Sequence, residues 1–95
     1  MWTIVEIANG RKSCENADLQ SSDIFPTLSL LEKNFAISYD ENAGIGLNIV
    51  GFDFRINRER VTIGWDNWSG IFIMSSEPSG DVVIEKIYEF IKGIL

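Results

Sequence analysis

The chain has 95 residues, of which 45% are hydrophobic, and this length and composition predict one globular domain over residues 1–95. Fourteen Asp and Glu against eight Lys and Arg give a net charge of -6, which disfavours binding to the phosphate backbone of nucleic acids. With a lone cysteine, Cys14, and no histidine, the sequence excludes an internal disulfide, a structural zinc site and every catalytic arrangement that needs an imidazole.

The N-terminal segment predicts a strand over residues 2–7, because its side chains alternate between two faces. Residues 8–22 are polar and rich in turn formers, so we expect a loop, part of which is ordered against the domain because the loop is long. The N-terminus lacks the features of a signal peptide, and no apolar run approaches the ~18 residues of a membrane span. We therefore expect a cytoplasmic location.

The next segment predicts a helix over residues 24–34. Asp23 stands at the N-cap position, and Pro26 falls in the first turn, where a missing N–H is tolerated. Its apolar residues recur at the spacing of one helical face. They are Ile24, Leu28, Leu31 and Phe35.

The middle of the chain predicts antiparallel strands joined by short turns, because apolar and polar residues alternate between turn formers. The expected strands cover residues 35–39, 47–56, 61–66 and 70–74. Asp81 or Ser79 then begins a closing helix whose apolar face runs from Val83 to Leu95. The predicted fold class is α+β: a two-layer sandwich with an antiparallel β-meander of four to five strands and two helices on one face.

No motif in the chain predicts an enzyme, a cofactor or a metal site. Asp40 begins a segment like a calcium loop, but glycines stand at the fifth and twelfth positions, Gly44 and Gly51. Gly44 and Gly46 begin a dinucleotide fingerprint that Ile49 interrupts. Turn chemistry explains these residues, and an enzyme that uses only carboxylates, with Asp40 and Asp53 on a divalent metal, is a rival interpretation.

Residues 61–85 combine two tryptophans with four acids and contain no Lys or Arg. We expect Trp65 to be core, because it follows Val61 and Ile63 along the same face. Trp68 lies beyond a tight turn, and the sequence leaves open whether it is core or interface. Aromatic anchors beside carboxylates are typical of interface centres.

Two helices can cover only one side of the sheet, so an uncovered face is expected as a docking surface. The residues expected there are Asp53, Arg55, Thr62, Gly64 and Asp66, with Ile49 and Ile71 or Ile73 among them.

The last third of the chain resembles small bacterial immunity proteins of contact-dependent growth inhibition and polymorphic toxin systems. The resemblance lies in "GWDNWSGIFIMS" at 64–75, "GD" at 80–81 and "VIEKIYEFI" at 83–91. It implies a protein that binds a cognate toxin domain, often a basic nuclease, and covers its active site. No diagnostic motif defines the family, so no binding residue is carried over from it.

Physical reasoning supplies the candidate contacts instead, because carboxylates that mimic phosphates can block a site built for a polyanion. The predicted partner-binding residues are Asp66, Trp68, Asp53, Asp40 and Glu41. We expect a basic toxin protein as partner, and a monomer rather than a homodimer. The alternative is an acidic dimeric secretion chaperone that holds an effector segment, and a plain structural subunit is a further one.

Overall fold

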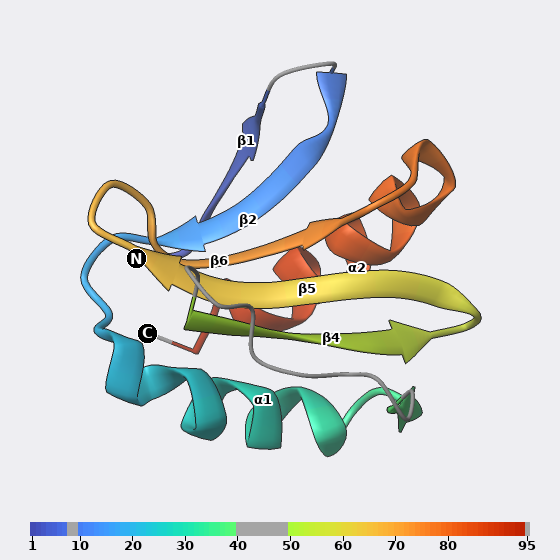
Figure 1. The fold of residues 1–95 in the computed structure, drawn as a ribbon, viewed down its shortest axis with the longest axis horizontal. Coiled ribbons are helices and arrows are strands. Elements are labelled where there is room, and N and C mark those ends of the chain that lie inside the picture. The colour runs from blue at the N-terminus through green and yellow to red at the C-terminus, as the bar shows by residue number, and fades with distance from the viewer. Residues whose placement is uncertain (8–9, 40–49, 95) are drawn as a thin grey trace.

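A six-stranded antiparallel sheet with the strand order β1-β2-β6-β5-β4-β3 organises the protein (Figure 1). The structure is a computed structural model that describes residues 1–7, 10–39 and 50–94. The strands are β1 (Thr3–Glu6), β2 (Lys12–Asn16), β3 (Ile37–Ser38), β4 (Val50–Ile56), β5 (Glu59–Asp66) and β6 (Gly70–Ser75). The helices are α1 (Ile24–Glu32) and α2 (Asp81–Ile91), each preceded by a 3-10 turn, η2 (Ser21–Asp23) and η3 (Pro78–Gly80).

The observed architecture confirms the predicted α+β class, with a correction to the strand count. Strands β3 to β6 form the expected meander, while the β1–β2 hairpin adds to its β6 side. Strand β2 occupies part of the segment that we expected to be a loop. Its sequence, KSCEN, lacks the β-branched and aromatic residues typical of strands, and it is ordered by pairing with β1 and β6. Tertiary pairing here overrides local propensity.

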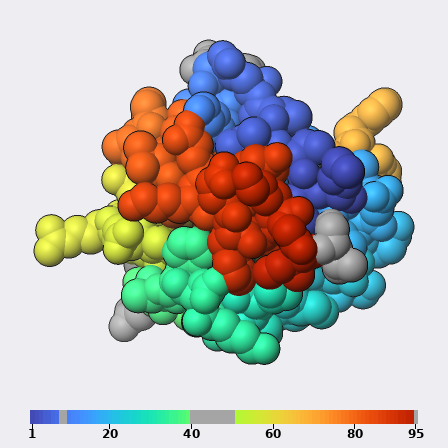
Figure 2. All heavy atoms as spheres, turned by 180° about the vertical axis from the view of Figure 1, so that it is seen from behind, coloured from blue at the N-terminus to red at the C-terminus, as the bar shows by residue number. Residues whose placement is uncertain are grey.

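Both helices pack on one face of the sheet, which we call the covered face. In the view from behind, α1 (teal) and the end of α2 (red) lie side by side (Figure 2). One apolar core fills the space between the two layers. Its sheet residues include Cys14, Phe54, Ile56, Val61, Ile63, Ile71 and Ile73.

Helix α1 begins at Ile24 as predicted and ends at Glu32, two residues earlier than expected. The predicted apolar face is confirmed, since Ile24, Leu28 and Leu31 are buried. The side chain of Asp23 has a different role from the one expected. Its Oδ2 accepts the backbone N–H of Gln20 at 2.8 Å, so the carboxylate closes the 3-10 turn that leads into α1.

Helix α2 begins at Asp81 and directs an apolar face towards the sheet, as the spacing predicts. The buried side chains are Val83, Ile84, Ile87 and Ile91. Phe90 meets Phe35 edge to face, with ring centroids 5.8 Å apart, and this contact joins the ends of the two helices.

Cys14 is a core residue of β2 and is fully buried. Burial raises the pKa of its thiol to about 12, so the sulfur stays protonated at neutral pH. Cys14 therefore contributes packing rather than thiolate chemistry.

Candidate functional site

The face of the sheet opposite the helices, which we call the open face, carries the candidate contact residues. In the described part of the chain both helices lie on the covered face, so no helix covers the open one. Strand register aligns its side chains in rows, and one row runs Glu15, Phe72, Gly64 and Gly51 across four strands.

The apolar residues of the open face are not those we predicted. Ile71 and Ile73 are fully buried on the covered face, so their expected place on the open face was wrong. Phe72 and Met74 take that place, because alternation along β6 sends them to the opposite side. Ile49 lies outside the described residues.

The turn between β5 and β6, residues 66–70, presents a tryptophan to solvent, and we call it the tryptophan turn. The Asp66 carboxylate accepts the backbone N–H groups of Trp68 at 2.8 Å and Ser69 at 2.6 Å. This arrangement fixes the backbone, as Asp side chains commonly do in turns. The Trp68 side chain is 91% exposed, and the turn projects from the molecule (golden spheres in Figure 2).

The two tryptophans of this segment therefore have different positions. Trp65 points to the covered face, as predicted, but is only partly buried: it packs against the edge of the core, and its Nε1–H donates to the backbone oxygen of Leu19 at 3.1 Å. Trp68 is a surface residue and not part of the core.

Asp53 lies on the open face but away from the tryptophan turn. It accepts a hydrogen bond from Thr62 Oγ1, its cross-strand partner on β5, at 2.6 Å. Asp66 is four residues further along β5 than Thr62, which places it roughly 13 Å away at the usual strand rise. The structure thus brings together Asp66 and Trp68 but not Asp53, while Asp40 and Glu41 lie outside the described residues.

A hollow of about 200 Å³ opens on the open face over β6, between β2 and β5. We call it the open-face hollow. Phe72 on β6 is the cross-strand neighbour of Gly64 on β5. Because glycine has no side chain, the surface next to the Phe72 ring is lower there. The lining residues are Ile7, Ser13, Glu15, Asp66, Ser69, Phe72 and Met74.

Two lining residues, Ser13 and Glu15, were missed by sequence reasoning because β2 was expected to be a loop. Ser13 is only 1% exposed, and its hydroxyl has no hydrogen-bond partner in the described structure. A buried hydroxyl left unpaired costs about 1–3 kcal/mol. A ligand group that bonds to this oxygen would recover that cost.

Three carboxylates of the open face have no ion-pair partner in the described part of the chain. Within residues 1–7, 10–39 and 50–94, none of Glu15, Asp53 and Asp66 forms an ion pair. This end of the face is therefore negative. Two positively charged residues, Arg55 on β4 and Arg60 on β5, are cross-strand neighbours at the far end of the same face.

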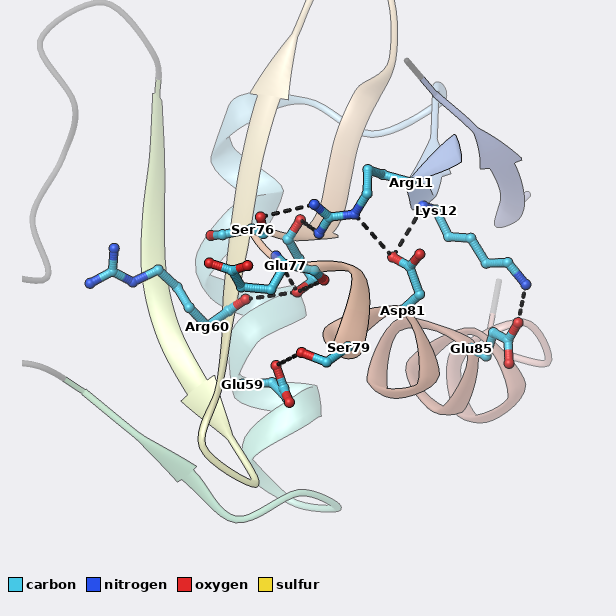
Figure 3. Close-up of polar contacts among 10 residues, drawn as sticks. Arg11, Lys12, Glu59, Arg60, Ser76, Glu77, Ser79, Asp81 and Glu85 are labelled. Atoms are coloured by element: carbon cyan, nitrogen blue, oxygen red, sulfur yellow. Dashed lines mark hydrogen bonds and ion pairs between the residues drawn. The ribbon is translucent and has the colours of Figure 1, made fainter. Parts of the chain in front are cut away.

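Two acids of the acid-rich window, Asp81 and Glu85, form ion pairs within the fold (Figure 3). The Arg11 guanidinium donates to the backbone oxygens of Ser75 at 2.6 Å and Ser76 at 2.9 Å, and its Nε lies 3.6 Å from Asp81 Oδ1. Lys12 pairs with Glu85, and this hydrogen bond raises the Lys12 pKa. These contacts tie β2 to the start of α2.

We expect Arg11→Ala to lower the free energy of unfolding by about 2–3 kcal/mol, because it removes charge-assisted hydrogen bonds from a largely buried position. Arg11→Lys keeps the positive charge but lacks the planar guanidinium with its several donors, so it should lower the free energy of unfolding by less than Arg11→Ala does. Urea denaturation of both variants measures the difference. A midpoint for Arg11→Ala equal to that of the wild type would show that these contacts are not stabilising.

A larger groove, of about 570 Å³, lies on the other side of the sheet between the β1–β2 hairpin and α2. Its lining is partly apolar and carries both signs of charge. The residues are Ile4, Lys12, Val82, Glu85, Lys86, Tyr88 and Glu89.

Comparison of the chain with protein-family models, with curated proteins and with solved structures finds no match. In the described ranges, no helix is both long and apolar enough to cross a membrane. No group of three or more Cys, Asp or Glu side chains gathers at metal-binding distance in the same part of the chain.

Proposed function

We propose that this protein acts by binding another protein, with the tryptophan turn and the adjoining open face as its contact surface. The observation that carries this proposal is Trp68, a large aromatic side chain that is 91% exposed on a turn held by the Asp66 carboxylate. Exposing so much apolar area has a cost in water, and tryptophans in such positions are typical anchors of interfaces. A fixed backbone also reduces the entropy lost on binding.

The charge of the chain favours a basic partner. The net charge is -6. Asp66 in the tryptophan turn and Glu15 on β2 have no ion-pair partners in the described structure. A negative field accelerates association with a positive surface and aligns the two proteins.

Within this class, we favour an immunity protein that neutralises a cognate toxin domain in the cytoplasm by covering its active site. Two arguments support this choice: the resemblance of the last third of the chain to small bacterial immunity proteins, and the negative open face. A toxin that acts on nucleic acid presents a cationic site, which carboxylates can occupy in place of phosphates.

Co-expression tests the proposal directly. The probe is the C-terminal domain of the exported protein encoded directly upstream of this gene. We expect that domain to arrest growth alone, and expect growth to recover when this chain is produced with it. The two should also co-elute as one complex in size-exclusion chromatography. Continued growth arrest with both proteins present, or separate elution, would overturn the proposal, as would the lack of any such upstream gene.

The second candidate, an acidic dimeric secretion chaperone, is favoured by a different surface. Strand β1 is an edge strand, and Ile7 N–H donates to Arg11 O at 2.7 Å. In an antiparallel pair, every second residue bonds to the neighbouring strand and the residues between point away from it. Because Ile7 bonds to Arg11, directly before β2, the backbone N–H and C=O groups of Ile4 and Glu6 point away from β2, and Ile4 also lines the larger groove. An extended segment could pair there. A homodimer in multi-angle light scattering would favour the chaperone, whereas a monomer favours the inhibitor.

A further inference from the structure

We propose that the open-face hollow is a receptor for one arginine side chain of the partner protein. The inference rests on the proposed protein-binding function and names the chemistry that the surface recognises. Three features carry it: two carboxylates on opposite sides of the hollow, an aromatic floor, and a buried hydroxyl without a partner.

The carboxylates approach the hollow from different strands. Glu15 is on β2 and Asp66 on β5, with β6 between them. Strand spacing and register put their Cα atoms roughly 12 Å apart, so the side chains can meet one guanidinium from two sides. Asp66 uses Oδ1 in the tryptophan turn, which leaves Oδ2 for a ligand.

The shape of the hollow suits a guanidinium better than an ammonium. Phe72 supplies an aromatic ring, the kind of group on which a planar cation stacks, and Met74 adds apolar lining. A guanidinium has five N–H donors in a plane, enough to bond both carboxylates and a third acceptor. The volume of about 200 Å³ is far above the roughly 10–15 Å³ that a single water requires.

Ser13 provides the third acceptor. Ser13 is one of the residues that line the hollow, and its buried hydroxyl lacks a hydrogen-bond partner in the part of the chain that the structure describes. The described contacts of β2 leave this polar atom unpaired. An arginine N–H donated to Ser13 Oγ accounts for it.

The test is a titration of the ¹⁵N-labelled protein with N-acetyl-arginine-N-methylamide, followed by NMR. The neutral analogue N-acetyl-citrulline-N-methylamide, which has nearly the same shape, is the control ligand. We expect saturable shifts of the amides of Glu15, Ser69 and Phe72 with arginine, and binding of citrulline at least about tenfold weaker. Equal affinity for the two ligands, or shifts spread over the surface without saturation, would overturn the proposal.

Matched variants locate the binding. Glu15→Gln and Asp66→Asn each remove one charge from the hollow, and the Asn amide oxygen can still accept the bonds of the tryptophan turn. Each should weaken arginine binding by about tenfold. Asp53→Asn removes the same charge from the open face outside the hollow and should leave binding within about twofold. Equal losses of arginine affinity in all three variants would show that the overall negative charge of the surface attracts arginine, and would overturn the proposed receptor.

Ser13→Ala distinguishes a serine that binds the arginine from a serine that only supports the fold. We expect the free protein to become more stable, because an unpaired buried hydroxyl is removed, while arginine binding weakens. Lower stability without weaker binding would contradict the assigned role.

The outcome separates this inference from the proposed function. If a partner binds but the arginine probe does not, the receptor assignment fails alone. If the arginine probe binds but no partner protein does, the proposed protein-binding function fails, while the assignment of the hollow as a site for a cation stands.

Discussion

Replacing Gly70 by alanine is expected to lower the free energy of unfolding by at least about 3 kcal/mol, which is a large part of the roughly 5–14 kcal/mol expected for a domain of this size. Gly70 has φ +69, a conformation that L side chains rarely adopt. A Cβ there would lie 2.1 Å from the backbone oxygen of Asn16 and 2.6 Å from the Cα of Ala17. Because both atoms belong to the backbone, the β2–β6 pairing must shift to relieve the clash.

Urea denaturation measures this loss, and Gly93→Ala provides the control. A Cβ at Gly93 meets no atom within 4 Å in the described structure, and the residue lies on the exposed end of the chain after α2. Its substitution should change stability by no more than about 0.5 kcal/mol. If Gly70→Ala unfolded at the same urea concentration as Gly93→Ala, the close approach of β2 to the tryptophan turn would be wrong.

The fold class, both helices and the meander were predictable from the sequence, because each has a regular apolar period. Helix α1 repeats at helical spacing, and β4 and β5 alternate at every second residue. Strand β2 was not predictable in this way. KSCEN has no apolar alternation, and its only fully buried apolar side chain is Cys14. Its conformation comes from pairing with β6, a partner far away in the sequence.

The candidate site was predicted less completely for the same reason. The tryptophan turn was visible in the sequence, but the direction of Trp68 depends on the turn geometry that Asp66 imposes. Glu15 and Ser13 reach the open face only because β2 is a strand. The acid-rich window gave a misleading signal, since Asp81 forms an ion pair with Arg11 and Glu85 forms one with Lys12 across the fold. Charge counted along the sequence does not reveal which acids are already paired.

Trp68→Ala is expected to weaken binding of the cognate partner by about 100-fold, which corresponds to roughly 3 kcal/mol and is typical of a central aromatic anchor. The same substitution should change the stability of the free protein by at most about 0.5 kcal/mol, because the side chain is 91% exposed. Isothermal titration calorimetry with the partner domain of the co-expression test measures the first value, and urea denaturation measures the second.

Val82→Ala distinguishes the two binding surfaces. Val82 is also an exposed apolar residue, but it lines the larger groove beside α2, on the other side of the sheet. If the open face is the contact surface, Val82→Ala should leave affinity within about twofold while Trp68→Ala abolishes most of it. The reverse pattern would assign binding to the groove, where an extended segment can meet the free edge of β1, and would favour the chaperone. Because each variant removes exposed apolar area from one surface only, the pair decides between the functions without any assumption about the partner's activity.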